Sequence, residues 1–329
     1  MIAYIFTRMS TKQFFLISFF LYAISGFAQQ ADSLKKSESY YRLQYDNDFF
    51  SATDRYYTQG VRNELIIPAF KHSPLSKALF SLRSATKNYY GMAIYREGFT
   101  PRSIRHEELY VGERPYACVS MISAFIISLD NAKHQRLTTQ LDLGVIGPAA
   151  NGGLEQKTIH RWLNNIQPLG WQYQIGNDAV INYDINYENG ISIKKHAEMI
   201  AFCNARVGTL YDNIGAGLLF RAGWLNPYFE TYGLFKDSEA GKKLGCTFFA
   251  KGEIKAVGYN ATLQGGLFNR NSIYIIPNND VVRAVAITSG GIILSYKQFS
   301  LEYTKVYITP EFKGGLDHGW GQCVIMFCF

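Results

Sequence analysis

Two short segments of this chain combine side chains that could take part in chemistry. The first places an amide and a carboxylate side by side at Asn47 and Asp48, with the hydroxyl of Thr58 ten residues later. The second places Gln156 and His160 four residues apart, which puts them on one side of a predicted helix. Together they offer a metal ligand, a general base and hydrogen-bond donors. Whether they form one site depends on the fold that joins them.

His160 is the residue in these segments that could act as a base. An imidazole with an ordinary pKa of about 6.5 is neutral at working pH and accepts a proton from water or a hydroxyl. A loop histidine is also commonly inert, so the spacing alone leaves both interpretations open. The other histidines have no comparable neighbourhood and are interpreted as loop or surface residues: His72, His106, His134, His196 and His318.

Asn47 and Asp48 lie in the first predicted strand. Successive strand residues face opposite sides, so these two cannot both line one surface unless the strand bulges or ends there. They could satisfy the backbone of a strand-end turn, or they could offer oxygen ligands to calcium. The chain contains no Gly-x-Ser-x-Gly elbow, His-Glu-x-x-His helix or P-loop, and no feature activates Ser51, Ser120 or Ser123.

The amino terminus has the pattern of a secretory signal. Arg8 and Lys12 precede or flank an apolar run over residues 14–27, which predicts a signal peptide over residues 1–28 and a single mature domain over 29–329. Removing Arg8 and Lys12 lowers the formal net charge from +7 to +5. This mild charge identifies no partner, and export together with the absence of a nucleic-acid motif argues against nucleic acid.

The composition and the alternation of residues predict an all-β membrane protein. The chain has 23 Tyr, 23 Phe and 29 Gly, but no later apolar run approaches the ~18 residues of a helical span. Polar and apolar residues alternate over 136–145 and 181–188, which suits strands with lipid on one face and a polar lumen on the other. A transmembrane antiparallel β-barrel of about 12 strands follows. The further strand candidates are Tyr40–Phe50, Tyr56–Ile67, Asn88–Arg96, Tyr116–Leu129, Glu198–Leu210, Asn213–Ala222, Lys242–Val257, Asn260–Asn269, Val281–Ser295, Phe299–Tyr307 and Gly321–Phe329.

One long connection has a different period. Within Gly147–Pro168, Ile159, Leu163 and Ile166 recur at helical spacing, which predicts a short amphipathic loop helix near the outer rim. Such a helix could serve only for packing, or it could form one wall of a binding site.

Several short motifs in one order give the chain a resemblance to the outer-membrane lipid A 3′-O-deacylase family. They cover roughly residues 41–188, and the later strands match only as barrel. The motifs are Asn47-Asp48, Tyr57-Thr58-x-Gly60, Phe99-Thr100-Pro101, Arg114-Pro115-Tyr116-Ala117, Leu143-Gly144-Val145-Ile146-Gly147-Pro148, Gln156-Lys157-x-x-His160 and Pro168-x-Gly170-Trp171-x-x-Gln174.

The resemblance implies a twelve-stranded barrel with a calcium-dependent ester hydrolase site between the wall and a loop helix. It implies that Asp48 helps to hold Ca²⁺ with Asn47 beside it, and that His160 is the general base. Thr58 would line the site, and Gln156 would contact the substrate or order the helix.

Two further positions bear on this resemblance. Arg114 is an additional substrate-binding candidate, although its Pro-Tyr-Ala context also suits a structural role. Cys118 stands where the family pattern leads us to expect Gly, which concerns the local packing of the wall. The implied substrate is lipid A or lipopolysaccharide in the outer leaflet, losing its 3′-linked acyloxyacyl chain, and we expect the protein to act as a monomer.

Two other functions remain open from the sequence. One is a non-enzymatic channel or binding barrel whose polar lumen is its function. The other keeps the esterase but uses a serine nucleophile together with His160.

Overall fold

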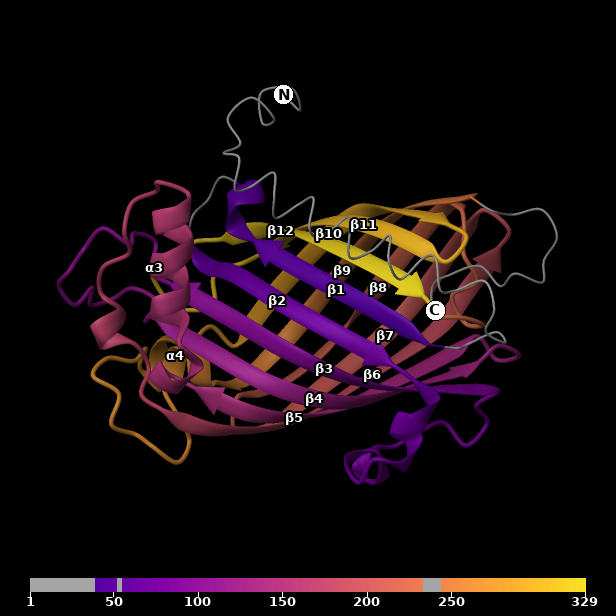
Figure 1. The fold of residues 1–329 in the computed structure, drawn as a ribbon, viewed down its shortest axis with the longest axis horizontal. Helices are drawn as coiled ribbons and strands as arrows, with labels where there is room; N and C mark the ends of the chain where they lie inside the picture. Colours follow the sequence, from indigo (N-terminus) through magenta and orange to yellow (C-terminus); the bar gives the residue numbers. More distant parts are fainter. Residues whose placement is uncertain (1–38, 52–54, 233–243) are drawn as a thin grey trace. The chain divides into compact units, whose positions relative to one another are not determined.

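The computed structural model describes residues 39–51, 55–232 and 244–329 of the chain. The predicted signal peptide over residues 1–28 lies outside them. Twelve antiparallel strands form a closed barrel, shown from the side in Figure 1. The strands are β1 (Tyr40–Asn47), β2 (Tyr56–Ile66), β3 (Lys87–Thr100), β4 (Ala117–Asp130), β5 (Gln135–Ile146), β6 (Asp178–Lys194), β7 (Ala197–Gly208), β8 (Tyr211–Trp224), β9 (Leu244–Asn260), β10 (Ala284–Tyr296), β11 (Phe299–Ile308) and β12 (His318–Cys328).

The described helices are short and lie in the connections between strands. Two are α-helical, α3 (Gly152–Trp162) and α4 (Ala261–Gln264). None in the described ranges has the length and apolarity needed to cross a membrane. The others are the 3₁₀ helices η2 (Asp48–Ser51), η3 (Pro68–His72), η4 (Leu75–Ala78), η5 (Pro148–Ala150), η6 (Trp171–Tyr173) and η7 (Asn278–Asp280).

The barrel closes where β1 pairs with β12, from Tyr40 opposite Cys328 to Asn47 opposite Gly321. Closure satisfies the backbone groups of every wall strand, which a sheet in a membrane requires. Along β9, Phe248 and Ile254 point outward and are more than half exposed. Glu253, which precedes Ile254 and so faces the other side of the strand, is buried. The predicted alternation of an apolar outer face and a polar inner face is therefore confirmed.

One predicted strand is wrong. The segment Asn260–Asn269 was expected to form a strand of the barrel wall, but Asn260 ends β9 and α4 begins at the next residue. The Asn260 side chain accepts a hydrogen bond from the Thr262 backbone N–H at 3.0 Å, which caps this helix. Without that segment the count is twelve.

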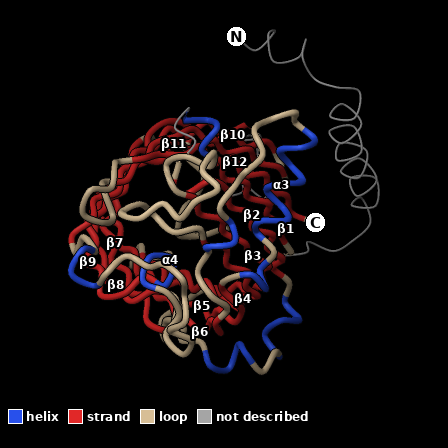
Figure 2. Tube along the Cα trace, turned by 90° about the vertical axis from the view of Figure 1, so that its left-hand side faces the viewer, coloured by secondary structure: helices blue, strands red, loops and turns tan. Residues whose placement is uncertain are grey.

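We call the two ends of the barrel the loop end and the turn end. The turn end carries two-residue connections such as Lys297–Gln298, between β10 and β11, and also the connection from β2 to β3 that contains η3 and η4. The longest connections are at the other end. The loop end carries α3 and α4, at the left of Figure 1. Longer loops are the extracellular ones in outer-membrane barrels, so the loop end faces outward. Figures 1 and 2 both place α3 beside the loop-end termini of β1, β2 and β3.

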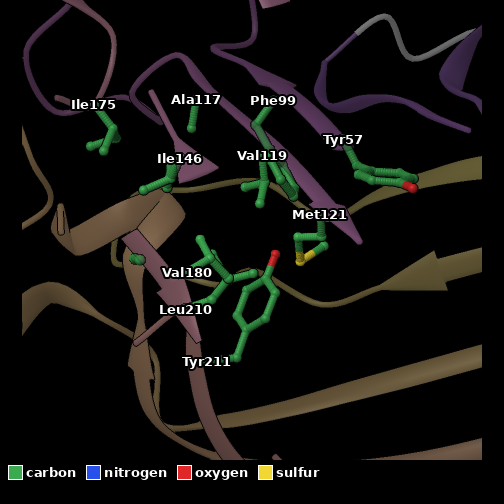
Figure 3. Close-up of a cluster of buried hydrophobic side chains, with 11 residues drawn as sticks. Tyr57, Phe99, Ala117, Val119, Met121, Ile146, Ile175, Val180, Leu210 and Tyr211 are labelled. Carbon is green, nitrogen blue, oxygen red and sulfur yellow. The ribbon is translucent and has the colours of Figure 1, made fainter. Parts of the chain in front are cut away.

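An apolar cluster supports the wall beneath this end. Figure 3 shows how it extends from Ile175 across Val119 and Met121 to Tyr57, with side chains from several neighbouring strands. The cluster comprises Tyr57, Phe99, Ala117, Val119, Met121, Ile146, Ile175, Val180, Leu210, Tyr211 and Ala261. Close packing of this kind holds the strand ends in fixed positions.

A second group of side chains crosses the lumen near the turn end. The lumen segment, Asn226–Tyr232, follows β8 and contacts three strands spaced around the barrel. Tyr232 donates to Glu64 of β2 at 2.9 Å, Tyr228 donates to Glu188 of β6 at 2.8 Å, and Asn226 donates to Ser295 of β10 at 3.0 Å. Because β2, β6 and β10 lie at different positions around the barrel, the segment spans the lumen.

Candidate active site

The first part of the site lies where β1 ends. The strand stops at Asn47, whose Oδ1 accepts a hydrogen bond from the Phe49 backbone N–H at 2.8 Å. This bond turns the chain into η2, which begins at Asp48. Asp48 is 3% exposed. The two side chains therefore do not have to share one face of a strand, because the strand ends between them.

Thr58 lies in the neighbouring strand at an irregular position. Tyr57 of β2 pairs with Phe99, but the next pair is Gln59 with Gly98, so Thr58 is the extra residue of a bulge. A bulge redirects the side chains around it. Gln59 is also the partner of Asn47 across the β1–β2 pair. Asn47, Asp48 and Thr58 thus belong to one hairpin end.

A polar contact fastens α3 to this hairpin. Glu155 accepts a hydrogen bond from Gln59 of β2 at 2.9 Å and pairs with Arg96 of β3 at 2.5 Å. Arg96 also donates to the Ala150 carbonyl oxygen, just before the helix, at 2.5 Å. Two adjacent strands therefore hold the helix at its first turns, and the residue that follows Glu155 is Gln156.

The start of α3 sits very close to the wall. A Cβ on Gly152 would lie 2.4 Å from the Cβ of Cys118, so only glycine allows this approach. Cys118 is buried, with its Sγ 3.6 Å from the Ala150 carbonyl oxygen. Cys118, which stands where the family pattern has Gly, therefore fills the space under the start of α3. All five cysteines are free thiols.

Gln156 is buried and held by Trp171. The indole Nε1 of Trp171 donates to the Gln156 Oε1 at 2.7 Å, and this contact fixes the amide orientation because an indole N–H can only donate. The Trp171 ring packs on Tyr116 with centroids 4.9 Å apart. Burial raises the pKa of the Tyr116 phenol, which donates to the Leu169 carbonyl oxygen. The Gln156 Nε2 is buried with no hydrogen-bond partner.

His160 lies one turn further along α3 and is partly exposed. Its Nδ1 lies 2.5 Å from the Ile166 carbonyl oxygen. A carbonyl oxygen can only accept, so Nδ1 carries the proton in this contact, and the neutral ring has its lone pair on Nε2. The loop after the helix therefore selects the tautomer that a general base requires.

Arg114 lies elsewhere, on the inner side of the wall. It is 1% exposed, pairs with Glu311 at 2.5 Å and donates to Thr262 of α4 at 2.8 Å. Its guanidinium also lies 4.4 Å from the centre of the Phe99 ring. These contacts join separate loops and strands inside the barrel, so they favour the structural role for Arg114 over contact with the substrate.

The oxygen atoms near Asp48 suit a hard cation. In the described ranges no three or more His, Cys, Asp or Glu side chains are grouped to hold a metal. Ca²⁺ also accepts amide, hydroxyl and backbone oxygens, which Asn47, Thr58 and the turn at η2 contain. A buried carboxylate among such groups fits calcium in its chemistry, and Asp48 is the charged group among them.

The structure thus brings the β1–β2 hairpin end and α3 together, with Asn47, Asp48 and Thr58 on one side and Gln156 and His160 on the other. Sequence reasoning gave no role to the residues that join and support them. Trp171 is a residue of one quoted motif and could have been found there, whereas Gln59 occupies the position that Tyr57-Thr58-x-Gly60 leaves unspecified. Arg96 and Glu155 give no local signal, because only the folded wall brings them together.

A closed barrel of twelve antiparallel strands with an apolar outer face defines the class as an outer-membrane β-barrel protein. The model of the family described as outer membrane protein LpxR matches residues 14–329, and the chain belongs to this family. The protein is therefore an outer-membrane hydrolase of the lipid A 3′-O-deacylase type.

A solved structure shows the same fold. LpxR from Salmonella typhimurium is 22% identical with a TM-score of 0.71, covering 88% of this chain and 100% of that one. The β-domain of the Bordetella autotransporter BrkA is 8% identical, with a TM-score of 0.46, 90% of this chain covered and 100% of that one. No curated protein sequence matches the chain.

Proposed function

We propose that this protein removes the 3′-linked acyloxyacyl chain of lipid A by direct attack of water, at the site between α3 and the outer wall at the β1–β2 hairpin. The observation that carries the proposal is the contact of His160 Nδ1 with the Ile166 carbonyl oxygen, 2.5 Å long. It leaves the lone pair of Nε2 free to accept a proton.

The proton transfers follow from this tautomer. His160 Nε2 accepts a proton from a water molecule while the water oxygen bonds to the ester carbonyl carbon. The resulting imidazolium then returns that proton to the sugar oxygen as its bond to the acyl carbon breaks. The products are the free fatty acid and the sugar hydroxyl. No covalent acyl-enzyme is needed.

The other residues orient the ester. Gln156 has its Oε1 engaged by Trp171, so its buried Nε2 is the donor available to a substrate oxygen. Asp48, with Asn47 and Thr58 beside it, would hold calcium. When bound, Ca²⁺ supplies positive charge that stabilises the negative charge developing on the carbonyl oxygen. We assign Arg114 to positioning of the loops inside the barrel.

The position of the site suits a lipid substrate. The outer wall beside it is apolar, for example at Tyr45 and Ile94, which are exposed. Leu154 and Trp162 of α3 are also exposed, at 69% and 71%. The acyl chains can therefore stay in the membrane while the ester reaches the polar groups.

A serine nucleophile has less support. Ser123 is fully buried and donates to Asp142 at 2.5 Å inside the barrel, on β4 and β5. Its hydroxyl is thus already committed to a carboxylate of the lumen.

Mass spectrometry of lipid A tests the proposal directly. Cells that express the wild-type protein should yield lipid A lighter by the 3′ acyloxyacyl group, and cells that express His160→Ala should not. Unchanged lipid A with correctly assembled wild-type barrel would sink the proposed activity. Labelling of the protein by a serine-directed acyl probe would instead favour the serine route.

A further inference from the structure

The lumen contains a cavity that the deacylation mechanism does not use. It has a volume of about 270 Å³ and lies on the inner side of β1–β3, between these strands and β11–β12. Its wall includes the carboxylates of Asp46 and Glu97 and the ring of Trp320. The proposed ester site lies on the opposite, outer side of the same wall.

The two carboxylates are held by phenols. Tyr57 donates to Asp46 at 2.8 Å, while Tyr95 and Tyr211 donate to Glu97 at 2.5 and 3.0 Å. Tyr57 belongs to β2 and Tyr211 to β8, so these phenols, both labelled in Figure 3, come from different strands. Each phenol gives its single proton to a carboxylate, so toward the cavity it presents only acceptor lone pairs and a ring face.

This arrangement is built into the backbone. A Cβ on Gly60 would lie 2.0 Å from the Tyr57 hydroxyl and 3.0 Å from the Asp46 Oδ2. Only glycine at this position leaves space for the Tyr57–Asp46 hydrogen bond. The strand thus accommodates the pair without displacing either group.

Asp46 and Glu97 lack the direct arginine contact that several other carboxylates of the lumen have. Glu64, Glu198 and Glu311 each pair with an arginine. Among the described ion pairs none includes Asp46 or Glu97, although both are at least nine-tenths buried. A cation bound in this cavity would therefore meet two buried carboxylates that no described lysine or arginine contacts directly.

A separate observation also indicates a ligand. His318 is 2% exposed and lines the same cavity, yet its Nδ1 has no hydrogen-bond partner. Buried polar atoms are normally satisfied, and an unsatisfied one suggests an absent partner. The adjacent Trp320 ring, 4.7 Å from Tyr57 and 5.8 Å from His318 between centroids, adds an aromatic surface.

We propose that this cavity binds a small organic ammonium ion. Its N–H groups would be shared between Asp46, Glu97 and the free Nδ1 of His318, and its alkyl part would lie against the Trp320 ring, whose face attracts cations. The volume far exceeds that of a bare metal ion. The proposal is independent of the ester site, because none of these residues has a role there.

Calorimetry on the purified, detergent-solubilised protein tests this binding. The probes are ethanolammonium and 1,4-diammoniobutane, with ethylene glycol and 1,4-butanediol as neutral molecules of matched size, all in excess potassium chloride. We expect saturable binding of at least one ammonium probe and none of the diols. Glu97→Gln and Asp46→Asn should each weaken binding at least about tenfold, which corresponds to the loss of about 1.4 kcal/mol.

A charge-matched control is Glu302→Gln on β11, which removes a carboxylate that lies outside the cavity and accepts from Thr304. It should bind the probe like the wild type. Heat-modified gel mobility establishes that each variant is a folded barrel. Absence of saturable binding, equal binding of the diols, or unchanged binding by both Glu97→Gln and Asp46→Asn would each overturn the proposal.

Discussion

Gln59 and Glu155, separated by 96 positions in the chain, are joined by a hydrogen bond of 2.9 Å between Nε2 and Oε1. This bond connects the strand that follows the Asn47-Asp48 turn to the helix that carries Gln156 and His160. Arg96 reinforces it by pairing with the other oxygen of the same carboxylate. The relative position of the two halves of the site therefore depends on Glu155.

Glu155→Gln should lower deacylation about tenfold or more while the barrel still folds. The change removes the charge that Arg96 faces, and hydrogen bonds to charged groups are worth about 1.5–3 kcal/mol. The measurement is the initial rate of fatty-acid release from lipid A in mixed micelles. Exchanging the two charges with Arg96→Glu and Glu155→Arg should restore part of the rate. Glu198→Gln, which breaks the 2.5 Å pair with Arg221 near the turn end, is the matched control; equal losses in both would show a general effect of stability.

His160→Gln should lower the rate by about 10² or more, because a positioned base contributes roughly 10²–10⁴. Glutamine keeps a polar side chain of similar size but cannot take up the proton. The control is His196→Gln, since the Nδ1 of His196 also contacts a backbone carbonyl oxygen, that of Gly223, at 3.2 Å. Activity of His160→Gln within a few fold of wild type would remove His160 as the base.

Chelation should abolish deacylation, and added Ca²⁺ should restore it. Asp48 is the buried carboxylate that we expect to hold the ion, and removing its charge weakens binding of a hard cation. Asp48→Asn should accordingly need a much higher Ca²⁺ concentration for half-maximal rate. A calcium titration of both proteins gives this comparison. An undiminished rate in excess EDTA would argue against calcium altogether.

Trp171→Phe should loosen α3 without unfolding the barrel. Phenylalanine keeps the packing on Tyr116 but removes the indole N–H, so the buried Gln156 Oε1 loses its donor at a cost of about 1–3 kcal/mol. Hydrogen exchange of residues 152–162 should become faster, whereas exchange of the wall strands should not. Unchanged protection of the helix would show that this hydrogen bond is not needed to order it.

The lumen segment should keep the barrel from conducting ions. Wild-type protein in planar bilayers should show no steady conductance, because Tyr228 and Tyr232 are anchored to Glu188 and Glu64 on separate parts of the wall. Replacing residues 226–232 with Gly and Ser should open a measurable current. A wild-type conductance equal to that of the variant would contradict a closed lumen and revive the channel hypothesis.

The barrel itself could be predicted because polar and apolar side chains alternate with a period of two residues along its strands, and this alternation can be read from the sequence. The helix was also predicted, but the spacing of Ile159, Leu163 and Ile166 extended the predicted helix too far. The helix α3 ends at Trp162, and Leu163 and Ile166 beyond it are exposed and not packed. Their apolar character suits a membrane surface as well as a core. The false strand Asn260–Asn269 had strand-like residues, but the capping bond of Asn260 favoured a helix there.

The candidate site could be assembled from the sequence only as a list of residues. Family motifs pointed to Asp48 and His160. These residues belong to one region only because the strands pair in a fixed register around the closed barrel. In the sequence Glu155 is an ordinary charged helix residue, and its role becomes visible only through its contacts with Gln59 and Arg96. Long-range contacts of this kind have no signature in local spacing.

The outer location of the site changes how the rate should be described. Because α3 lies beside the wall and not inside the barrel, the proposed substrate would arrive and the fatty acid would depart sideways, within the leaflet. Encounter would then take place in two dimensions, and the rate would follow the mole fraction of lipid A in the surface and not its amount per volume. Diluting lipid A with inert lipid at constant total substrate would slow the enzyme, whereas diluting the whole suspension with buffer would not.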